Sequence, residues 1–170
     1  TREAETAPPD RLAACGAEAL ARALASGDPE RAVPVVERWS ERARTREARE
    51  AFAMLLEECG RTEELAEALD ALASHLEGPA RAANRRRLGY LHAAEGRSDA
   101  AIAAWREALA HDPEDLASLG AAAEALAEAA RDAELIELCD AHAATAAHAP
   151  TVEAHYALAL ERAGRHEDAA

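Results

Sequence analysis

Apolar residues recur along the chain at the three- and four-residue spacing of a single helix face. Leu65, Leu69 and Leu72 form one such run, and similar runs of Ala, Leu and occasional aromatic residues follow one another along the sequence. Successive runs are separated by a small residue and a polar pair. The period-two alternation of β-strands does not occur. The pattern therefore predicts helices joined by tight turns.

The small residue and its polar pair return at nearly constant intervals. The copies are Gly27-Asp28-Pro29, Gly60-Arg61-Thr62, Gly96-Arg97-Ser98, Ala130-Arg131-Asp132 and Gly164-Arg165-His166. The steps between them are 33, 36, 34 and 34 residues. A repeat of this length without β signal indicates stacked pairs of helices, each pair with a turn at its centre.

The clearest unit covers about residues 82–115. Its signature is Leu88, Gly89, Gly96, Ala101, Trp105, Ala108 and Pro113. This spacing resembles the tetratricopeptide repeat (TPR), a helix-turn-helix unit of 34 residues. Small side chains at Gly89 and Ala101 would let the two helix backbones approach closely, with Leu88 and Trp105 filling the space beside them. We expect Ser98 to cap the second helix, and the segment 112–115 to cap the next one with Pro113 at its first position.

The resemblance implies an all-α, right-handed solenoid of antiparallel helix pairs, with four complete pairs and a partial fifth. The expected units are about 11–45, 46–79, 82–115, 116–149 and a truncated 150–170. Residues 1–10 are interpreted as a tail or linker, and the chain as an excerpt of a longer protein. In the first unit, Pro34 predicts that the second helix starts near Val33 or kinks, because proline removes a backbone hydrogen bond.

Composition agrees with a helical fold and narrows the function. The chain has 50 Ala and 19 Leu but only 3% aromatic residues, which disfavours a β-sandwich or barrel. The net charge of -14 disfavours binding to nucleic acid or anionic lipid. No apolar run approaches the ~20 residues of a membrane span. Three scattered Cys do not form a disulfide framework.

Catalytic, cofactor and metal signatures are missing from the sequence, so we expect neither an enzyme nor a cofactor. The eight Gly are isolated and form no phosphate-binding loop. Cys139, His142 and His148 are the nearest approach to a metal motif, but no second ligand pair stands at zinc spacing. We interpret Cys139 as a packing residue of a helix.

The resemblance also implies which residues face the concave groove of the repeat. The expected partner-binding positions are Glu50, Met54, Glu58, Arg86, Arg87, Tyr90, Glu124, Glu128, His155, Glu161 and Arg162. Arg86 and Arg87 belong to the basic run 85–87, which could instead be a solvated helix start paired with acids of the preceding unit. The Lys and Asn residues with which family members clamp a peptide carboxylate are missing.

We therefore expect a protein-protein interaction module or scaffold that binds a basic or amphipathic peptide or helix in its groove. A substrate-recognition appendage of an enzyme with its catalytic domain elsewhere is the alternative, and self-assembly through the last repeat is a third. A cytoplasmic location is favoured. The sequence does not indicate the partner's identity or the oligomeric state.

Overall fold

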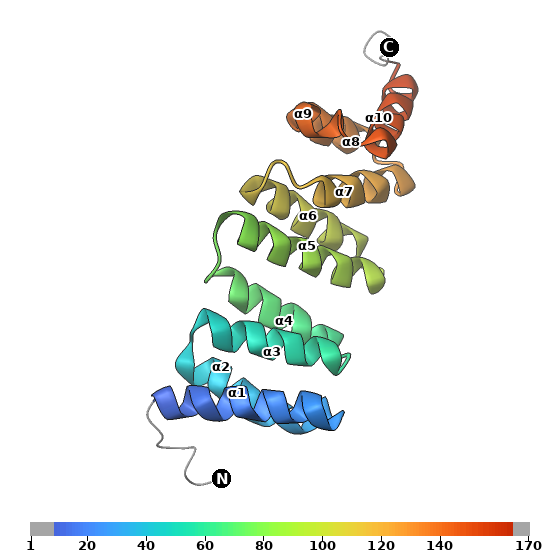
Figure 1. Cartoon of the computed structure of the whole chain (residues 1–170). Helices are drawn as coiled ribbons and strands as arrows, with labels where there is room; N and C mark the ends of the chain where they lie inside the picture. Colours follow the sequence, from blue (N-terminus) through green and yellow to red (C-terminus); the bar gives the residue numbers. More distant parts are fainter. Residues whose placement is uncertain (1–8, 165–170) are drawn as a thin grey trace. The chain divides into compact units, whose positions relative to one another are not determined.

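The computed structural model describes residues 9–164, and the side chains of residues 14–164. Within this part of the chain every regular element is a helix and no strand occurs. The helices form antiparallel pairs, four in all, followed by one further helix, which confirms the predicted fold class (Figure 1). The chain divides into two compact units between Leu76 and Glu77. We call residues 9–76 unit 1 and residues 77–164 unit 2.

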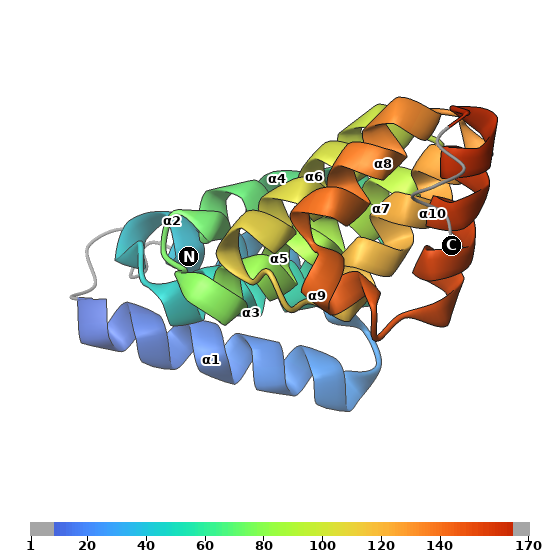
Figure 2. The same ribbon diagram turned by 90° about the horizontal axis from the view of Figure 1, so that it is seen from above.

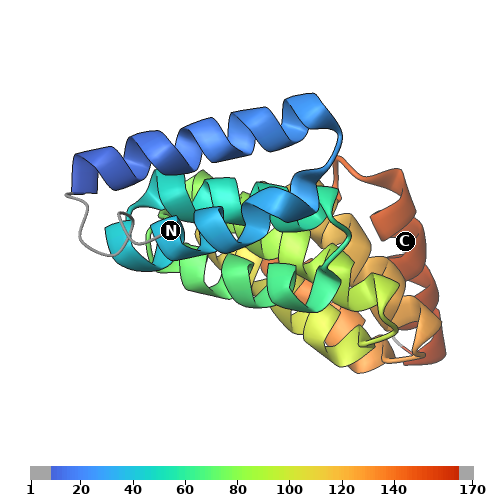
Figure 3. The same cartoon turned by 90° about the horizontal axis from the view of Figure 1, so that it is seen from below.

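Unit 1 holds two helix pairs. Its elements are α1 (Pro9–Ser26), the 3-10 helix η2 (Pro29–Ala32), α2 (Val33–Ala43), α3 (Arg46–Glu58) and α4 (Thr62–Ala73). α1 lies along α2 and α3, as the blue helix in Figure 3 shows. Their shared core includes Val36, Trp39 and Leu55. The expected effect of Pro34 is confirmed, because α2 begins at Val33 and Pro34 lies in its first turn. A backbone N–H at that position has no acceptor within the helix, so the proline costs no hydrogen bond.

Unit 2 holds two helix pairs and a final helix. Its elements are α5 (Gly78–Ala94), α6 (Ser98–His111), α7 (Leu116–Glu128), α8 (Asp132–Ala141), the short α9 (Ala143–Ala146) and α10 (Pro150–Arg162). Figure 2 shows α10 beside α7 and α8, and it packs on both. A continuous core runs through the unit from Trp105 to Leu160. Burial of Ala, Leu and Trp side chains between helices is what stabilises this layered arrangement.

The helix ends marked by the small residue share one backbone conformation. The small residue of each turn has a positive φ, between 54° and 75°, at Gly27, Gly60, Gly96, Ala130 and Gly164. In three of these turns the next residue donates its N–H to a carbonyl five positions back: Arg61 to Leu56, Arg97 to His92 and Arg131 to Leu126. This is the Schellman closure that ends a helix at a left-handed residue. The repeated small residue and polar pair in the sequence therefore mark real helix ends.

The contact at Gly89 agrees with the expectation. A Cβ atom on Gly89 would lie 2.3 Å from Nε1 of Trp105. The space left by the missing side chain is thus occupied by the indole ring. α5 and α6 also pack more extensively than the other described helix pairs, in agreement with the predicted close approach of the two helices. Gly89 matters because it lets a large aromatic side chain lie fully between the helices.

The capping role predicted for Ser98 and the helix position predicted for Pro113 are wrong, whereas the prediction that segment 112–115 caps the next helix is confirmed. Ser98 is the first residue of α6 and makes no capping hydrogen bond, because the preceding Arg97 occupies the cap position. Pro113 lies in the loop before α7, and the helix begins three residues later at Leu116. The cap of α7 is Asp115, whose side chain accepts hydrogen bonds from the N–H groups of Ala117 and Ser118. The cap therefore comes from the last residue of the predicted segment, and a carboxylate that accepts two backbone donors is a strong cap.

Candidate functional site

Three of the predicted concave-face residues come together around one groove in unit 2. We call it the α5–α7 groove; its volume is about 280 Å³. It is lined by Tyr90, Ala93, Ser98, Ala101, Trp105, Ala121, Glu124, Ala125 and Glu128. Tyr90, Glu124 and Glu128 are the predicted residues among them. The first helices of two successive repeats thus form its sides, with α6 between them.

The floor of the α5–α7 groove is apolar and its rim is acidic. Trp105 is buried, and Tyr90 packs edge-on against it with ring centroids 5.5 Å apart, although Tyr90 itself is 49% exposed. Alanines complete the floor. Glu124 and Glu128 are exposed one helical turn apart on α7, and neither forms an ion pair within the described residues. The groove can therefore bury an apolar group and pair a cation at its edge.

Arg86 is held by an acid of the following helix pair. It donates a hydrogen bond to Asp115 over 2.7 Å, and Asp115 is only 7% exposed. Burial alone would raise the pKa of Asp115, but hydrogen bonds from Ser118 and from Arg86 outweigh burial and lower that pKa below its ordinary value. Arg86 therefore ties α5 to the capped end of α7. In the same basic run, Arg85 pairs with Glu107 of α6 over 2.9 Å.

The other predicted positions lie apart from this groove. In unit 1, Glu50, Met54 and Glu58 share one face of α3; Met54 is 47% exposed, and Glu50 pairs with Arg46 over 2.7 Å. Arg87 is half-buried on α5. On α10, His155 is half-buried and Glu161 is exposed, while Arg162 pairs with Asp132 over 3.3 Å. Whether any of these positions contacts a partner stays a prediction.

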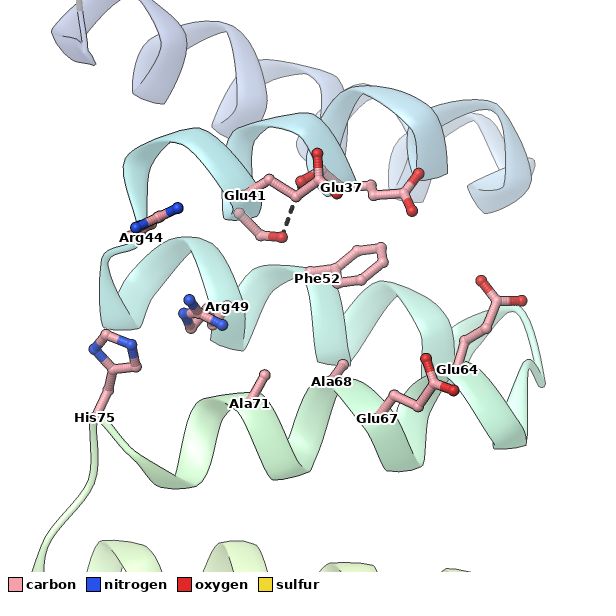
Figure 4. A pocket seen from close by; sticks show the side chains of 11 residues that line it. Glu37, Glu41, Arg44, Arg49, Phe52, Glu64, Glu67, Ala68, Ala71 and His75 are labelled. Carbon is pink, nitrogen blue, oxygen red and sulfur yellow. Dashed lines mark hydrogen bonds between the residues drawn. The ribbon is translucent and has the colours of Figure 1, made fainter.

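A second groove, in unit 1, was missed from the sequence. It lies between α2 and α4, over α3, and Figure 4 shows the side chains that line it. Its residues on α3 are Arg49 and Phe52. At 100° per residue these two point away from the face that carries Glu50, Met54 and Glu58. The repeat resemblance points to the first helix of each pair, so nothing in the sequence indicated a groove between the second helices α2 and α4.

Cys139 has the burial of a packing residue. It is 1% exposed within the core of unit 2, and burial raises the pKa of its thiol to about 11. At neutral pH the group is a thiol and not the thiolate that binds metals. His148, the most distant member of the suspected motif, has its Nδ1 2.8 Å from the carbonyl of Ala144. Among residues 14–164 no cluster of three potential metal ligands is found.

Helix length and hydropathy within residues 9–164 give no candidate for a bilayer-crossing segment. No protein-family model matches the sequence, nor does any curated protein sequence. Solved structures do match. A MamA protein shares 14% identity, covering 94% of this chain and 87% of its own, with a TM-score of 0.65. The TPR-like repeats of a putative kinesin light chain from Podospora anserina share 21%, covering 96% and 92%, with a TM-score of 0.54.

A third similar structure is YrrB, described as a TPR protein with an unusual peptide-binding site. It shares 13% identity, covers 88% of this chain and 77% of its own, and has a TM-score of 0.59. The chain has the TPR fold. At these identities the likeness concerns the fold alone, and TPR proteins generally act as protein-protein interaction modules. The TPR resemblance inferred from Leu88, Gly89, Gly96 and Trp105 is therefore confirmed at the level of the fold.

Proposed function

We propose that this TPR chain is a protein-interaction module, and that the α5–α7 groove of unit 2 holds a segment of its partner. The observation that carries the proposal is the combination in one groove of a Trp105–Tyr90 aromatic floor with the two unpaired carboxylates of Glu124 and Glu128. Half-exposed tyrosine is a residue that binding surfaces favour, because it contributes contact area with little loss of side-chain entropy.

The chemistry of the groove selects the partner. An apolar side chain covers Tyr90, and a Lys or Arg side chain beside it meets the carboxylates of α7. A partner segment that is amphipathic and basic satisfies both requirements, and an acidic segment is repelled by the rim and by the overall charge of -14. Electrostatic attraction of this kind mainly speeds association and weakens as salt is added.

Intrinsic fluorescence gives a direct test, because the chain contains only two Trp residues, Trp39 in unit 1 and Trp105 in the groove. With Trp39→Phe, Trp105 becomes the only reporter. A blocked amphipathic peptide carrying Arg and Leu is titrated, and the same peptide with Glu in place of Arg serves as its counterpart. We expect a saturable change in Trp105 emission with the basic peptide and none with the acidic one. Far-UV circular dichroism checks that the Trp39→Phe chain is folded.

Charge-neutral variants locate the contact. Glu124→Gln combined with Glu128→Gln should weaken binding of the basic peptide about three- to tenfold, from the loss of two rim-exposed attractions. The matched control is Glu137→Gln with Glu153→Gln, which makes the same charge change at exposed positions of α8 and α10 outside the groove. Equal losses in the two double variants, or equal binding of the acidic peptide, would show that the groove is not the site.

A further inference from the structure

The hollow of unit 1, here called the α2–α4 groove, has a volume of about 730 Å³, within the range of ligand-binding clefts. Its lining is Glu37, Ser40, Glu41 and Arg44 from α2 and its end, Arg49 and Phe52 from α3, and Glu64, Glu67, Ala68, Ala71 and His75 from α4 and its end. All belong to unit 1. The groove therefore depends only on how three packed helices of one compact unit are arranged.

The middle of the α2–α4 groove is apolar. Phe52, the only phenylalanine of the chain, is half-buried: it packs against the core of unit 1 and also lines the groove. Ala68 and Ala71 of α4 lie opposite it (Figure 4). Because both alanines are small, the aromatic ring is left open to an apolar group that enters from solvent.

The two ends of the groove have opposite charge. Arg44, Arg49 and His75 lie together at one end in Figure 4, while Glu64 and Glu67 lie at the other, with Glu37 on the same side of Phe52. This separation follows from the fold. α2 and α4 each pack antiparallel to α3 and so run in the same direction, and Arg44 and His75 both follow the C-terminal ends of their helices. Helix dipoles favour this placement of charges.

Among these charges Glu64 is paired, with Arg61 over 2.6 Å, but most of the others have no ion-pair partner among the described residues. Within the described residues, Glu37, Glu41 and Glu67 form no ion pair, and neither do Arg44 and Arg49. The Nε atom of Arg49 is buried and has no hydrogen-bond acceptor. Elsewhere in the chain, neighbouring opposite charges pair closely, as Arg131 and Glu134 do over 2.7 Å. A solvent-facing groove that keeps cations and anions apart offers both to a ligand.

We propose that the α2–α4 groove binds a short extended segment of a partner protein in which an apolar side chain stands between a basic and an acidic one. The apolar group covers Phe52, the basic group meets Glu37 and Glu67, and the acidic group meets Arg44 and Arg49. This site is separate from the α5–α7 groove and uses the second helices of the repeats.

The required spacing of the ligand follows from helix geometry. Glu67 and His75 are eight residues apart on α4, roughly 12 Å at 1.5 Å per residue. An extended peptide covers that length in about four residues at roughly 3.3 Å each. The probe is therefore the pentapeptide Arg-Ala-Leu-Ala-Glu with blocked ends and a fluorescent label, together with its reverse, because either chain direction places the charges correctly.

Fluorescence anisotropy with the full chain tests the proposal. At least one of the two bipolar peptides should bind saturably, and five times more tightly or better than peptides with Arg at both ends or Glu at both ends. Raising the salt concentration should weaken this binding. Equal affinity for all four peptides, or none up to millimolar concentration, overturns the proposal.

Matched substitutions on α2 assign the contact. Arg44→Glu should weaken binding of the bipolar peptide at least fivefold and strengthen binding of the peptide with Arg at both ends. Arg38→Glu makes the same charge change on an exposed residue of the same helix outside the groove and should alter neither. A purely steric variant, Ala71→Gln, should also weaken binding, whereas Ala21→Gln on α1 should not. If Arg38→Glu acts like Arg44→Glu, only overall charge matters and the groove is not the site.

Discussion

Units 1 and 2 use the same packing device, but only unit 2 shows it in the repeat signature. In unit 2, Gly89 of α5 accommodates Trp105 of α6; in unit 1, Gly16 of α1 accommodates Trp39 of α2, and a Cβ on Gly16 would lie 2.4 Å from the indole. The sequence separation is 16 residues in one pair and 23 in the other. The seven additional residues lie on both sides of the turn: four between Gly16 and the turn glycine Gly27, and three between Gly27 and Trp39.

The third helix of each unit shows a second contrast. α3 is capped by Thr45, whose hydroxyl accepts one hydrogen bond from the N–H of Ala48 over 3.3 Å. α7 is capped by Asp115, which accepts from two backbone groups, from the hydroxyl of Ser118 over 2.8 Å and from Arg86. Equivalent places in the repeat therefore carry caps of different strength, and the stronger one is also tied to the preceding helix pair.

Substitution of the two helix glycines should give the largest effects. Gly89→Ala and Gly16→Ala each place a methyl group within 2.5 Å of an indole ring, which is too short for any contact. Because Trp105 and Trp39 are buried and cannot simply move aside, we expect each change to lower the free energy of unfolding by about 1–3 kcal/mol. Urea unfolding measures this, with tryptophan emission in Trp39→Phe and Trp105→Phe backgrounds reporting each unit separately.

Gly120 of α7 supplies the control for these changes. A Cβ there would meet nothing within 4 Å, so Gly120→Ala is the same substitution without the clash. It should stabilise the chain by about 0.5–1 kcal/mol, the difference in helix propensity between the two residues. If Gly89→Ala and Gly120→Ala shift the urea midpoint in the same direction, contact with Trp105 is not what fixes glycine at position 89.

The fold was predictable to the extent that it depended on local signals. The helix ends at Gly27, Gly60, Gly96, Ala130 and Gly164 each combine a residue of positive φ with a following polar pair, which can be recognised in the sequence. Gly16 was not recognised, because its partner Trp39 stands at a separation outside the fixed repeat spacing. A search with one fixed spacing cannot find the same contact where η2 and the part of α1 after Gly16 add residues between the glycine and the tryptophan.

The candidate sites were predictable only in part, for a similar reason. Tyr90, Glu124 and Glu128 were named from the repeat resemblance and do line one groove. The pairing of Arg86 with Asp115 was not foreseen, because the two residues are 29 positions apart and nothing in the sequence links them. The α2–α4 groove depends on how far Phe52 is left uncovered by small neighbours, which is a property of three-dimensional packing.

Breaking the stronger cap should have the next largest effect. Arg86→Gln leaves Asp115 buried with one fewer donor, and we expect a loss of about 1–3 kcal/mol of stability in unit 2. Thr45→Ala, which removes the weaker cap in unit 1, should cost about 1 kcal/mol. Arg22→Gln is the control: its pair with Glu18 is exposed, so its removal should cost less than about 0.5 kcal/mol.

The Asp115 cap should also depend on pH, which the Thr45 cap should not. Hydrogen bonding holds its folded pKa below the ordinary value, so its contribution is complete at pH 7 and declines as pH falls below about 4. The gap in urea midpoint between wild type and Asp115→Asn should therefore narrow from pH 7 to pH 3. A gap that stays constant would mean that the carboxylate's charge contributes nothing to the cap.

A small effect is expected at the turn that follows each third helix. Gly60 ends α3 in unit 1 with φ 67°, and Ala130 takes the equivalent place after α7 in unit 2 with φ 54°. A left-handed conformation costs an alanine about 1–2 kcal/mol, whereas glycine adopts it freely but loses more chain entropy on folding. Ala130→Gly should therefore raise the stability of unit 2 by about 0.5–1 kcal/mol.

A substitution of the same kind within a helix should act in the opposite direction. Ala103 is exposed in the interior of α6, and Ala103→Gly should lower stability by about 1 kcal/mol, because helical φ favours alanine. Urea midpoints followed through Trp105 emission compare the two variants in one unit. If Ala130→Gly lowers the midpoint as Ala103→Gly does, the turn after α7 gains nothing from glycine. Alanine at position 130 would then stabilise the end of α7 as well as Gly60 stabilises the end of α3.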